Sequence, residues 1–122
     1  MARILIIEDN ATNMTLATVL LQSAGHAVLA ATDAEAGVAL ARVEQPDLIL
    51  MDIQLPGMDG LQAATLLKGH VATRAIPLIA LTALAMKGHE QRIRAAGCDG
   101  YIAKPIRYRD FLATIATHLA QA

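Results

Sequence analysis

Short apolar runs alternate with longer segments of mixed polarity along the 122 residues of the chain. An aliphatic run such as Ile4-Leu5-Ile6-Ile7 is typical of a strand that is covered on both faces of a sheet. Between the runs, apolar residues recur every three or four positions, which predicts helices. The expected strands are residues 4–7, 27–30, 48–51, 78–81 and 101–103, and the expected helices are residues 11–24, 34–43, 61–67, 86–96 and 111–119.

Small polar residues and glycines mark where these helices begin and end. Asn10, Asp33 and Asp59 stand where a side-chain oxygen can cap the first N–H groups of a helix. Gly25 and Gly97 follow the first and fourth helices, as expected of residues that end a helix. Five strand–helix units follow one another without a linker or repeat, which predicts an α/β fold with a doubly wound parallel sheet and helices on both faces.

The composition agrees with a single globular domain, residues 1–122. Hydrophobic residues make up 55% of the chain and the net charge is −1, which argues against intrinsic disorder. The longest apolar stretch, residues 76–86, is shorter than a membrane span and contains Pro77 and Thr82. The chain begins with an apolar strand and lacks the pattern of a signal peptide. One cysteine excludes an internal disulfide, so we expect a cytoplasmic protein in which Cys98 is a small buried hydrophobic residue.

Charge is divided unevenly along the chain. Residues 1–67 carry eight acidic and two basic residues, and residues 68–122 carry three acidic and eight basic ones, which gives −6 and +5. Without a concentrated basic patch, and with only three aromatic residues, nucleic-acid binding is not expected. Glycine motifs for nucleotide phosphates are missing. The histidines show no metal-ligand spacing: His26, His70, His89 and His118.

Charged or hydroxyl side chains follow four of the five expected strands. Glu8 and Asp9 follow the first strand and Asp52 follows the third. Thr82 follows the fourth strand and Lys104 the fifth. In an open α/β sheet, ligands bind beyond the carboxyl ends of the strands. We therefore expect these five side chains to meet at one rim of the sheet.

Three carboxylates at one rim need a compensating charge. Two unit charges about 4 Å apart repel by about 4 kcal/mol at an effective dielectric near 20. Mg²⁺ would relieve this repulsion, because it suits sites with few carboxylates and several waters. Lys104 and Thr82 offer donors to the oxygens of a phosphoryl group, and a carboxylate can act as a nucleophile that forms an acyl phosphate. The residues therefore predict Mg²⁺-assisted phosphoryl transfer to an aspartate.

Four motifs carry a resemblance to a known family. They are Ile7-Glu8-Asp9-Asn10, the run LMDIQLPGMDG from Leu50 to Gly60, Ala80-Leu81-Thr82-Ala83 and Tyr101-Ile102-Ala103-Lys104-Pro105. In this order and spacing, the chain resembles the receiver domain of two-component response regulators over essentially its whole length. Ala85-Met86-Lys87-Gly88 and Ala96-Gly97-Cys98-Asp99 bring it nearer to single-domain receivers that regulate cell division. The resemblance implies a flavodoxin-like strand order 2-1-3-4-5 and a phosphorylation-dependent signalling switch.

The resemblance also implies a role for each acidic residue of the rim. Asp52 is the implied phosphoacceptor. Mg²⁺ would be bound directly by Asp9 and Asp52, through a water by Glu8, and by the main-chain carbonyl of Gln54. Glu8 departs from the aspartate that is commoner at its position in the family, so its longer side chain would reach the metal differently.

The remaining residues of the motifs imply a switch. Lys104 would contact the phosphoryl group, and its bond to Pro105 would be cis. Thr82 would move toward the phosphate and Tyr101 would turn inward, which would alter the surface of the fourth helix, fifth strand and fifth helix. Two alternatives stay open: Thr82 could simply cap the following helix, and Tyr101 could be a static ring at the edge of the sheet.

The implied partners are a histidine kinase or a histidine phosphotransfer protein. The chain ends just after the fifth helix, so we expect no output domain, and an output through contacts with other regulatory proteins in cell division or polarity. We expect a monomer, with a phosphorylation-induced dimer as the alternative, and no insertion into membranes. Phe111 is expected in the core and Tyr108 on the contact surface.

Three competing hypotheses remain. The chain could be a receiver excised from a hybrid histidine kinase, or a scaffold that binds partners in either phosphorylation state. It could also be a metal-dependent phosphohydrolase with an aspartyl nucleophile, but such enzymes generally need an acid where this chain has Gln54. Leu84, two residues after Thr82, is apolar and would obstruct an attacking water. We therefore expect slow loss of the phosphoryl group and no enzymatic activity beyond the protein's own phosphorylation and dephosphorylation.

Overall fold

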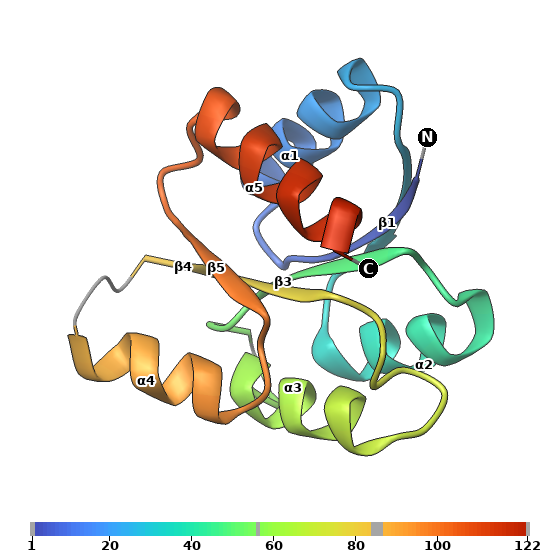
Figure 1. The fold of residues 1–122 in the computed structure, drawn as a ribbon, viewed down its shortest axis with the longest axis vertical. Coiled ribbons are helices and arrows are strands. Elements are labelled where there is room, and N and C mark those ends of the chain that lie inside the picture. The colour runs from blue at the N-terminus through green and yellow to red at the C-terminus, as the bar shows by residue number, and fades with distance from the viewer. Residues whose placement is uncertain (1, 56, 84–86, 122) are drawn as a thin grey trace.

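The computed structural model describes residues 2–55, 57–83 and 87–121, in which strands and helices alternate along the chain (Figure 1). The strands are β1 (Arg3–Ile7), β2 (Ala27–Ala31), β3 (Leu48–Asp52), β4 (Leu78–Thr82) and β5 (Gly100–Ala103). The helices are α1 (Ala11–Ser23), α2 (Ala34–Glu44), α3 (Gly60–Gly69), α4 (Lys87–Ala95) and α5 (Tyr108–Gln121). The α/β class and the order of elements predicted from the sequence are confirmed.

The five strands form one parallel sheet in the order β2-β1-β3-β4-β5, as the resemblance implied. β1 lies between β2 and β3, with Ile4 opposite Val28 on one side and Leu48 on the other. The order of the strands therefore reverses between β1 and β3. Ligands of such sheets bind at this reversal, so the ends of β1 and β3 are the place to look for a functional site.

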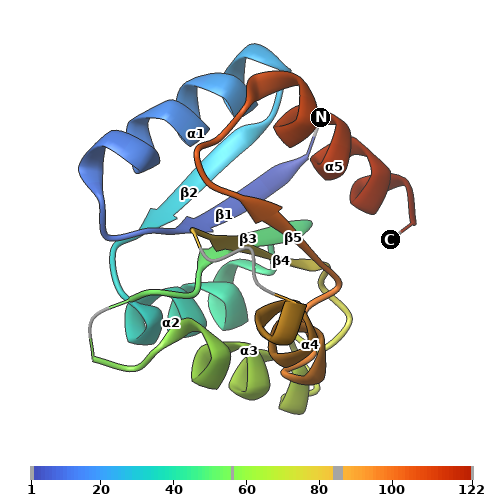
Figure 2. The ribbon, with the colours of Figure 1, turned by 90° about the vertical axis from the view of Figure 1, so that its left-hand side faces the viewer.

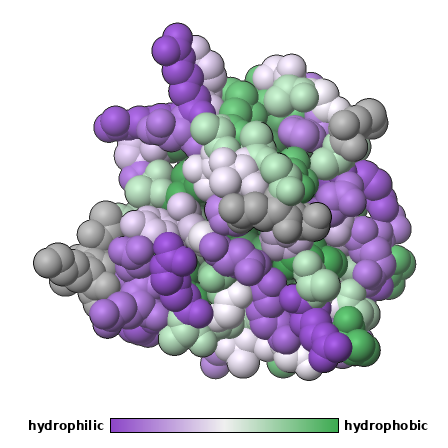
Figure 3. Space-filling model, in the orientation of Figure 1, coloured by the Kyte–Doolittle hydropathy of each residue, from purple (hydrophilic) through white to green (hydrophobic). Residues whose placement is uncertain are grey.

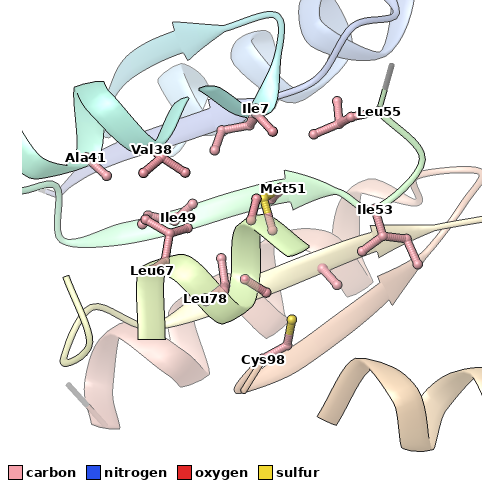
Figure 4. Close-up of a cluster of buried hydrophobic side chains, with 14 of the residues drawn as sticks. Ile7, Val38, Ala41, Ile49, Met51, Ile53, Leu55, Leu67, Leu78 and Cys98 are labelled. Atoms are coloured by element: carbon pink, nitrogen blue, oxygen red, sulfur yellow. The ribbon is translucent and has the colours of Figure 1, made fainter. Parts of the chain in front are cut away.

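Two hydrophobic cores cover the two faces of the sheet. In Figures 1 and 2, α1 and α5 lie on one face, and α2, α3 and α4 lie on the other. Side chains alternate between the faces, so Ile4 and Ile6 belong to one core while Leu5 and Ile7 belong to the other. Figure 4 shows the second core, in which Ile7 and other strand residues meet residues of α2 and α3.

The capping residues are those that the sequence predicts, but α5 begins at Tyr108, three residues before its expected start, and the other helix bounds differ by at most two residues. Asn10 and Asp33 cap α1 and α2 by accepting hydrogen bonds from main-chain N–H groups three residues later, at 3.0 and 2.8 Å. Asp59 forms a capping box with Gln62 at the start of α3. Gly25 and Gly97 both adopt positive φ, at 91° and 101°.

All five strands extend further than the sequence suggested: β1 and β5 begin one residue earlier, and the other three end one residue later. Ala31, Asp52 and Thr82 are each the last residue of their strand, because the parallel pairing continues to them. Asp52 is therefore held by the sheet itself. Met86, the first residue of the expected fourth helix, lies outside the described residues, and so do the side chains of residues 87–89.

Aromatic and sulfur-containing residues lie where they were expected. Phe111 is fully buried and Tyr108 is exposed. Cys98 is buried, and burial raises the pKa of its thiol to about 11.

Figure 3 shows that hydrophilic side chains cover much of the face presented in Figure 1, with hydrophobic patches between them. No helix in the described part of the chain is long and apolar enough to cross a bilayer.

Candidate functional site

The predicted rim residues lie together at the carboxyl ends of the central strands. Glu8 and Asp9 follow β1, and Asp52 is the last residue of β3. Carboxylate oxygens of these three acids all lie within 4.8 Å of one another. Lys104, which follows β5, reaches the same point with its ammonium group. The structure therefore brings together four residues that lie as many as 96 positions apart in the sequence, from 8 to 104.

Asp52 is held by both of its carboxylate oxygens. Its side chain is almost fully buried, with a relative exposure of 3% for the residue. Oδ1 accepts a hydrogen bond from the main-chain N–H of Gln54 at 2.8 Å, and Oδ2 accepts one from Lys104 Nζ at 2.8 Å. These two bonds and the sheet pairing of Asp52 fix the carboxylate in one orientation.

Glu8 contributes a second buried carboxylate. Its Oε1 accepts a hydrogen bond from the main-chain N–H of Asn10 at 3.1 Å. Its Oε2 lies 3.1 Å from Lys104 Nζ, an ion-pair distance, but the angles do not make a hydrogen bond. Burial raises the pKa of Glu8, and the neighbouring Asp52 raises it further, while the bond from Asn10 and the charge of Lys104 oppose the shift.

Lys104 is the cation between these two carboxylates. Burial by itself lowers the pKa of this ammonium, but its contacts with Asp52 and Glu8 outweigh burial, so the pKa is raised. Lys104 therefore stays charged at neutral pH. With Glu8, Asp9 and Asp52 ionised, one ammonium against three carboxylates leaves a net charge of −2 at the rim.

The donor set fits a hard divalent cation. A charge of −2 is balanced by one such ion, and carboxylate oxygens are the ligands that Mg²⁺ prefers. Glu8 Oε2 is buried and lies 3.1 Å from Lys104 Nζ, but it has no hydrogen-bond partner among the described residues, so it could accept a bond from a metal-bound water. Asp9 is exposed and can supply an oxygen from the solvent side. Asp59, by contrast, uses its carboxylate to cap α3.

The predicted switch residues lie on β4 and on its neighbour β5, which is an edge strand of the sheet. Thr82 is buried at the end of β4, and its carbonyl accepts a 2.7 Å hydrogen bond from the N–H of Lys104. Tyr101 is half-buried in β5 and lines a cavity of about 330 Å³ together with Lys104 and Pro105. The peptide bond between Lys104 and Pro105 is cis, as expected.

Gly60 has a role at the site that the sequence analysis missed. A Cβ on this residue would lie 2.3 Å from Cα of Ile53 and 2.7 Å from the carbonyl oxygen of Asp52. The N–H of Gly60 also donates to the carbonyl of Ile53 at 3.1 Å. Only glycine lets α3 begin directly against the backbone of the candidate nucleophile. The sequence signal for this role was the glycine immediately after the capping residue Asp59. The reason for the glycine is its contact with the backbone of Asp52 and Ile53, which the sequence does not show.

The strand order, and the cluster of one lysine and three acids at the strand reversal, are those that the resemblance to receiver domains implied. The chain matches the sequence model of the response regulator receiver domain over residues 4–116, and it belongs to that family. It is therefore a two-component signalling switch, of a family of signalling domains rather than of catalytic enzymes.

Named relatives agree with this assignment. The chain is 45% identical to the polar-differentiation response regulator DivK of Brucella anthropi over 119 residues, which are 98% of this chain and 97% of the relative. DivK of Brucella ovis matches equally well, with 45% identity over the same shares.

Solved structures share the fold closely. The receiver domain of a Pseudomonas aeruginosa sensor histidine kinase, with a magnesium ion coordinated in its active-site cleft, has a TM-score of 0.91 and 33% identity, with 98% of each chain covered. The chemotaxis response regulator CheY4 of Vibrio cholerae has a TM-score of 0.92 and 25% identity, with 97% of this chain and 98% of that chain covered.

Proposed function

We propose that Asp52 accepts a phosphoryl group from a histidine kinase or a histidine phosphotransfer protein. The observation that carries this proposal is the double restraint on the Asp52 carboxylate, by Gln54 N–H and by Lys104 Nζ, each at 2.8 Å. A nucleophile held in one orientation has less freedom to lose on reaching the transition state. Asp52 is the only one of the three clustered acids that contacts both of these donors among the described residues.

The transfer is a single displacement at phosphorus. One oxygen of Asp52 forms a bond to phosphorus while the bond from phosphorus to the donor's imidazole nitrogen breaks. The bonding electrons stay on that nitrogen, and Asp52 becomes an acyl phosphate. Lys104, now beside the phosphoryl group, donates to one of its oxygens and offsets part of the negative charge on that group.

A metal site belongs to this proposal. Glu8, Asp9 and Asp52, with the main-chain carbonyl of Gln54, are the groups that would hold Mg²⁺. The bound ion would neutralise charge on the phosphoryl oxygens during transfer. The 4.8 Å spread of the three carboxylate oxygens supports this ligand set. Glu8 would act through a water, as the resemblance implies.

The output of the switch is proposed to lie at the surface of α4, β5 and α5. Thr82 would move toward the phosphoryl group, and Tyr101 would turn inward. Tyr101 is half-buried on β5, the edge strand, where its ring packs against the core beneath α2, α3 and α4. The change would alter contacts with regulatory proteins in the cytoplasm, and we propose neither nucleic-acid binding nor membrane insertion.

The relatives named for polar differentiation support a role in cell polarity or division. We propose that residues 1–122 act as one receiver domain, monomeric before phosphorylation, and that the domain catalyses at most its own phosphorylation and dephosphorylation. Gln54, at the position where related phosphohydrolases carry an acid, supports this. Leu84 lies outside the described residues, and slow loss of the phosphoryl group remains a prediction from the sequence.

Incubation with acetyl phosphate and Mg²⁺ tests the proposal. Intact-protein mass spectrometry should show the gain of one phosphoryl group in the wild type, and no gain in Asp52→Asn, which keeps the shape of the side chain but not the nucleophile. Asp59→Asn, a change of the same kind in the nearby helix cap, should be phosphorylated like the wild type. An unmodified wild type, or a modified Asp52→Asn, would contradict the proposal.

A further inference from the structure

A second lysine forms a dense polar contact at the opposite end of the sheet from Asp52. Lys68 Nζ lies 2.7 Å from Asp99 Oδ2, 2.8 Å from the carbonyl oxygen of Ile76 and 3.2 Å from that of Arg74. An ammonium group has three donors, so all three are used. The Lys68 side chain is mostly buried by these contacts, with 18% of it exposed. We call Lys68 and Asp99 the distal clamp.

The distal clamp fixes the turn between α4 and β5. Asp99 Oδ2 also accepts a hydrogen bond from the N–H of Leu78, and the N–H of Asp99 donates to the carbonyl of Leu78, both at 2.8 Å. Gly97, with φ of 101°, lies over the aliphatic part of Lys68, so that an added Cβ would come within 2.8 Å of Lys68 Cγ. The turn is thereby joined to α3 and to the start of β4.

The clamped turn is continuous with the C-terminal end of α4. The N–H of Cys98 donates to the carbonyl of Ile93 at 3.3 Å, and Ile93 is the buried side chain among residues 90–95 of the helix. The end of α5 reaches the same turn, where His118 Nε2 lies 3.3 Å from the carbonyl oxygen of Asp99. In Figure 1, α4 runs from the side where β4 ends toward this turn and β5.

We propose that the distal clamp is the pivot about which α4 responds to phosphorylation of Asp52. A nine-residue helix is about 13 Å long and stiff. If one end is fixed and the other is displaced, such a helix rotates as a rigid body about its fixed end. Moving the clamped end would require breaking the bonds of Lys68 and Asp99 together. The N-terminal turn of α4 therefore moves and the turn at residues 97–99 stays. This inference rests on the proposed function.

Amide hydrogen exchange with and without phosphorylation tests the pivot. Wild-type protein in Mg²⁺ would be compared with the same protein kept phosphorylated by excess acetyl phosphate, with the added mass checked in parallel. We expect exchange in the first turn of α4 to change at least threefold and exchange at residues 97–100 to change less than twofold. Equal changes at both ends would overturn the pivot but not the proposed function. A wild type that gains no phosphoryl mass would overturn both.

Two variants remove the clamp and one serves as a control. Lys68→Met keeps the aliphatic contact with Gly97 but removes the ammonium, and Asp99→Asn removes the charge of the other partner. Each should speed exchange at residues 97–100 about tenfold before phosphorylation and let the phosphorylation response spread to that turn. Arg94→Met removes a positive charge from α4 itself, where Arg94 pairs with Glu90 at 3.5 Å on the surface, and should keep the wild-type pattern.

If Lys68→Met does not fold, Asp99→Asn decides the question, with thermal unfolding as the check on folding. Clamp variants that are phosphorylated and still confine the response to the first turn of α4 would overturn the pivot. The pivot would also be overturned if Arg94→Met spreads the response as far as the clamp variants do. The effect would then come from a change of charge on the domain and not from the clamp.

Discussion

At the scale of single residues, the charges around Lys104 are balanced only in part. Lys104 contacts Asp52 and Glu8, and Asp9 stands beside them with its own carboxylate. One cation cannot satisfy three acids, so part of the negative charge stays uncompensated until a proton or a metal ion arrives. Burial is the largest cause of the raised pKa of Glu8, and the neighbouring Asp52 adds to it.

Replacing Glu8 by glutamine should make stability less sensitive to pH. Because the folded state raises the pKa of Glu8, folding favours the protonated carboxyl. That contribution is present below the ordinary glutamate pKa and is lost as pH rises through the raised one. Without Mg²⁺, the free energy of unfolding of Glu8→Gln should therefore increase relative to that of the wild type as pH rises from 4 to 7. Urea titrations at each pH measure this difference. Glu35→Gln, on the surface of α2, should show no such gain.

Mg²⁺ should stabilise the folded protein through the same cluster. A ligand that binds only the folded state at ten times its Kd adds about 1.4 kcal/mol to the free energy of unfolding. Thermal unfolding with increasing Mg²⁺ should show this stabilisation in the wild type. Most of the stabilisation should be absent in Asp9→Asn. Asp59→Asn should keep the gain, because its carboxylate caps α3. Equal loss in both variants would mean that Asp59 takes part in the site.

At the scale of elements, the start of α3 is fixed by its contact with β3. Gly60 lies against the backbone of Ile53 and Asp52, whereas Gly69, the last residue of the same helix, has open space where a Cβ would be. The two glycines are therefore alike in sequence and different in their surroundings. The position of Asp52 depends on the first of them and not on the second.

Gly60→Ala and Gly69→Ala should have opposite effects. The Cβ at position 60 would meet backbone atoms, which cannot rotate away, so we expect a loss of about 3 kcal/mol in the free energy of unfolding. At position 69, alanine should be neutral or stabilise by up to about 1 kcal/mol, because glycine is a poor helix former. Urea unfolding of both variants checks this. Similar effects of the two changes would contradict the packing described for Gly60.

The elements were predicted well from the sequence because their signals are local. Aliphatic runs marked the strands, and Asn10, Asp33 and Asp59 marked the helix starts. Contacts between distant residues were not predictable in this way. The distal clamp joins Lys68 to Asp99, 31 positions later, and both residues look like ordinary surface charges in the sequence.

The candidate site was predictable for a topological reason. Residues that follow parallel strands must meet at one edge, so Glu8, Asp9, Asp52 and Lys104 can be grouped from the sequence alone. The hydrogen bonds and ion pairs among these residues could not be predicted. Which oxygen of Asp52 faces Lys104, and which oxygen of Glu8 has no hydrogen bond, depends on side-chain directions that no sequence spacing encodes.

At the scale of the whole molecule, the two cores share one sheet and should unfold together. Phe111 is fully buried between α5 and the sheet, and Tyr108, three positions earlier on the same helix, is exposed. Each strand contributes side chains to both cores. A loss of packing on one face therefore weakens the strands that support the other face.

Phe111→Ala should lower the free energy of unfolding by about 3–5 kcal/mol, a large part of the total for a domain of this size. The transition should stay single when followed by circular dichroism and by exchange of α3 amides on the opposite face. Tyr108→Ala should change stability by less than about 0.5 kcal/mol. A separate, earlier loss of α5 alone would show that the two faces unfold independently.

The position of Tyr101 has a spectroscopic consequence. The chain contains no tryptophan, so its near-ultraviolet emission comes from two tyrosines. Tyr108 is exposed, with its ring 5.8 Å from the Arg109 guanidinium, while Tyr101 is half-buried and packs against the core beneath α2, α3 and α4. In a Tyr108→Phe background, the fluorescence of the protein would come from one ring alone. Burial or release of that ring could then be followed in real time without attaching any dye.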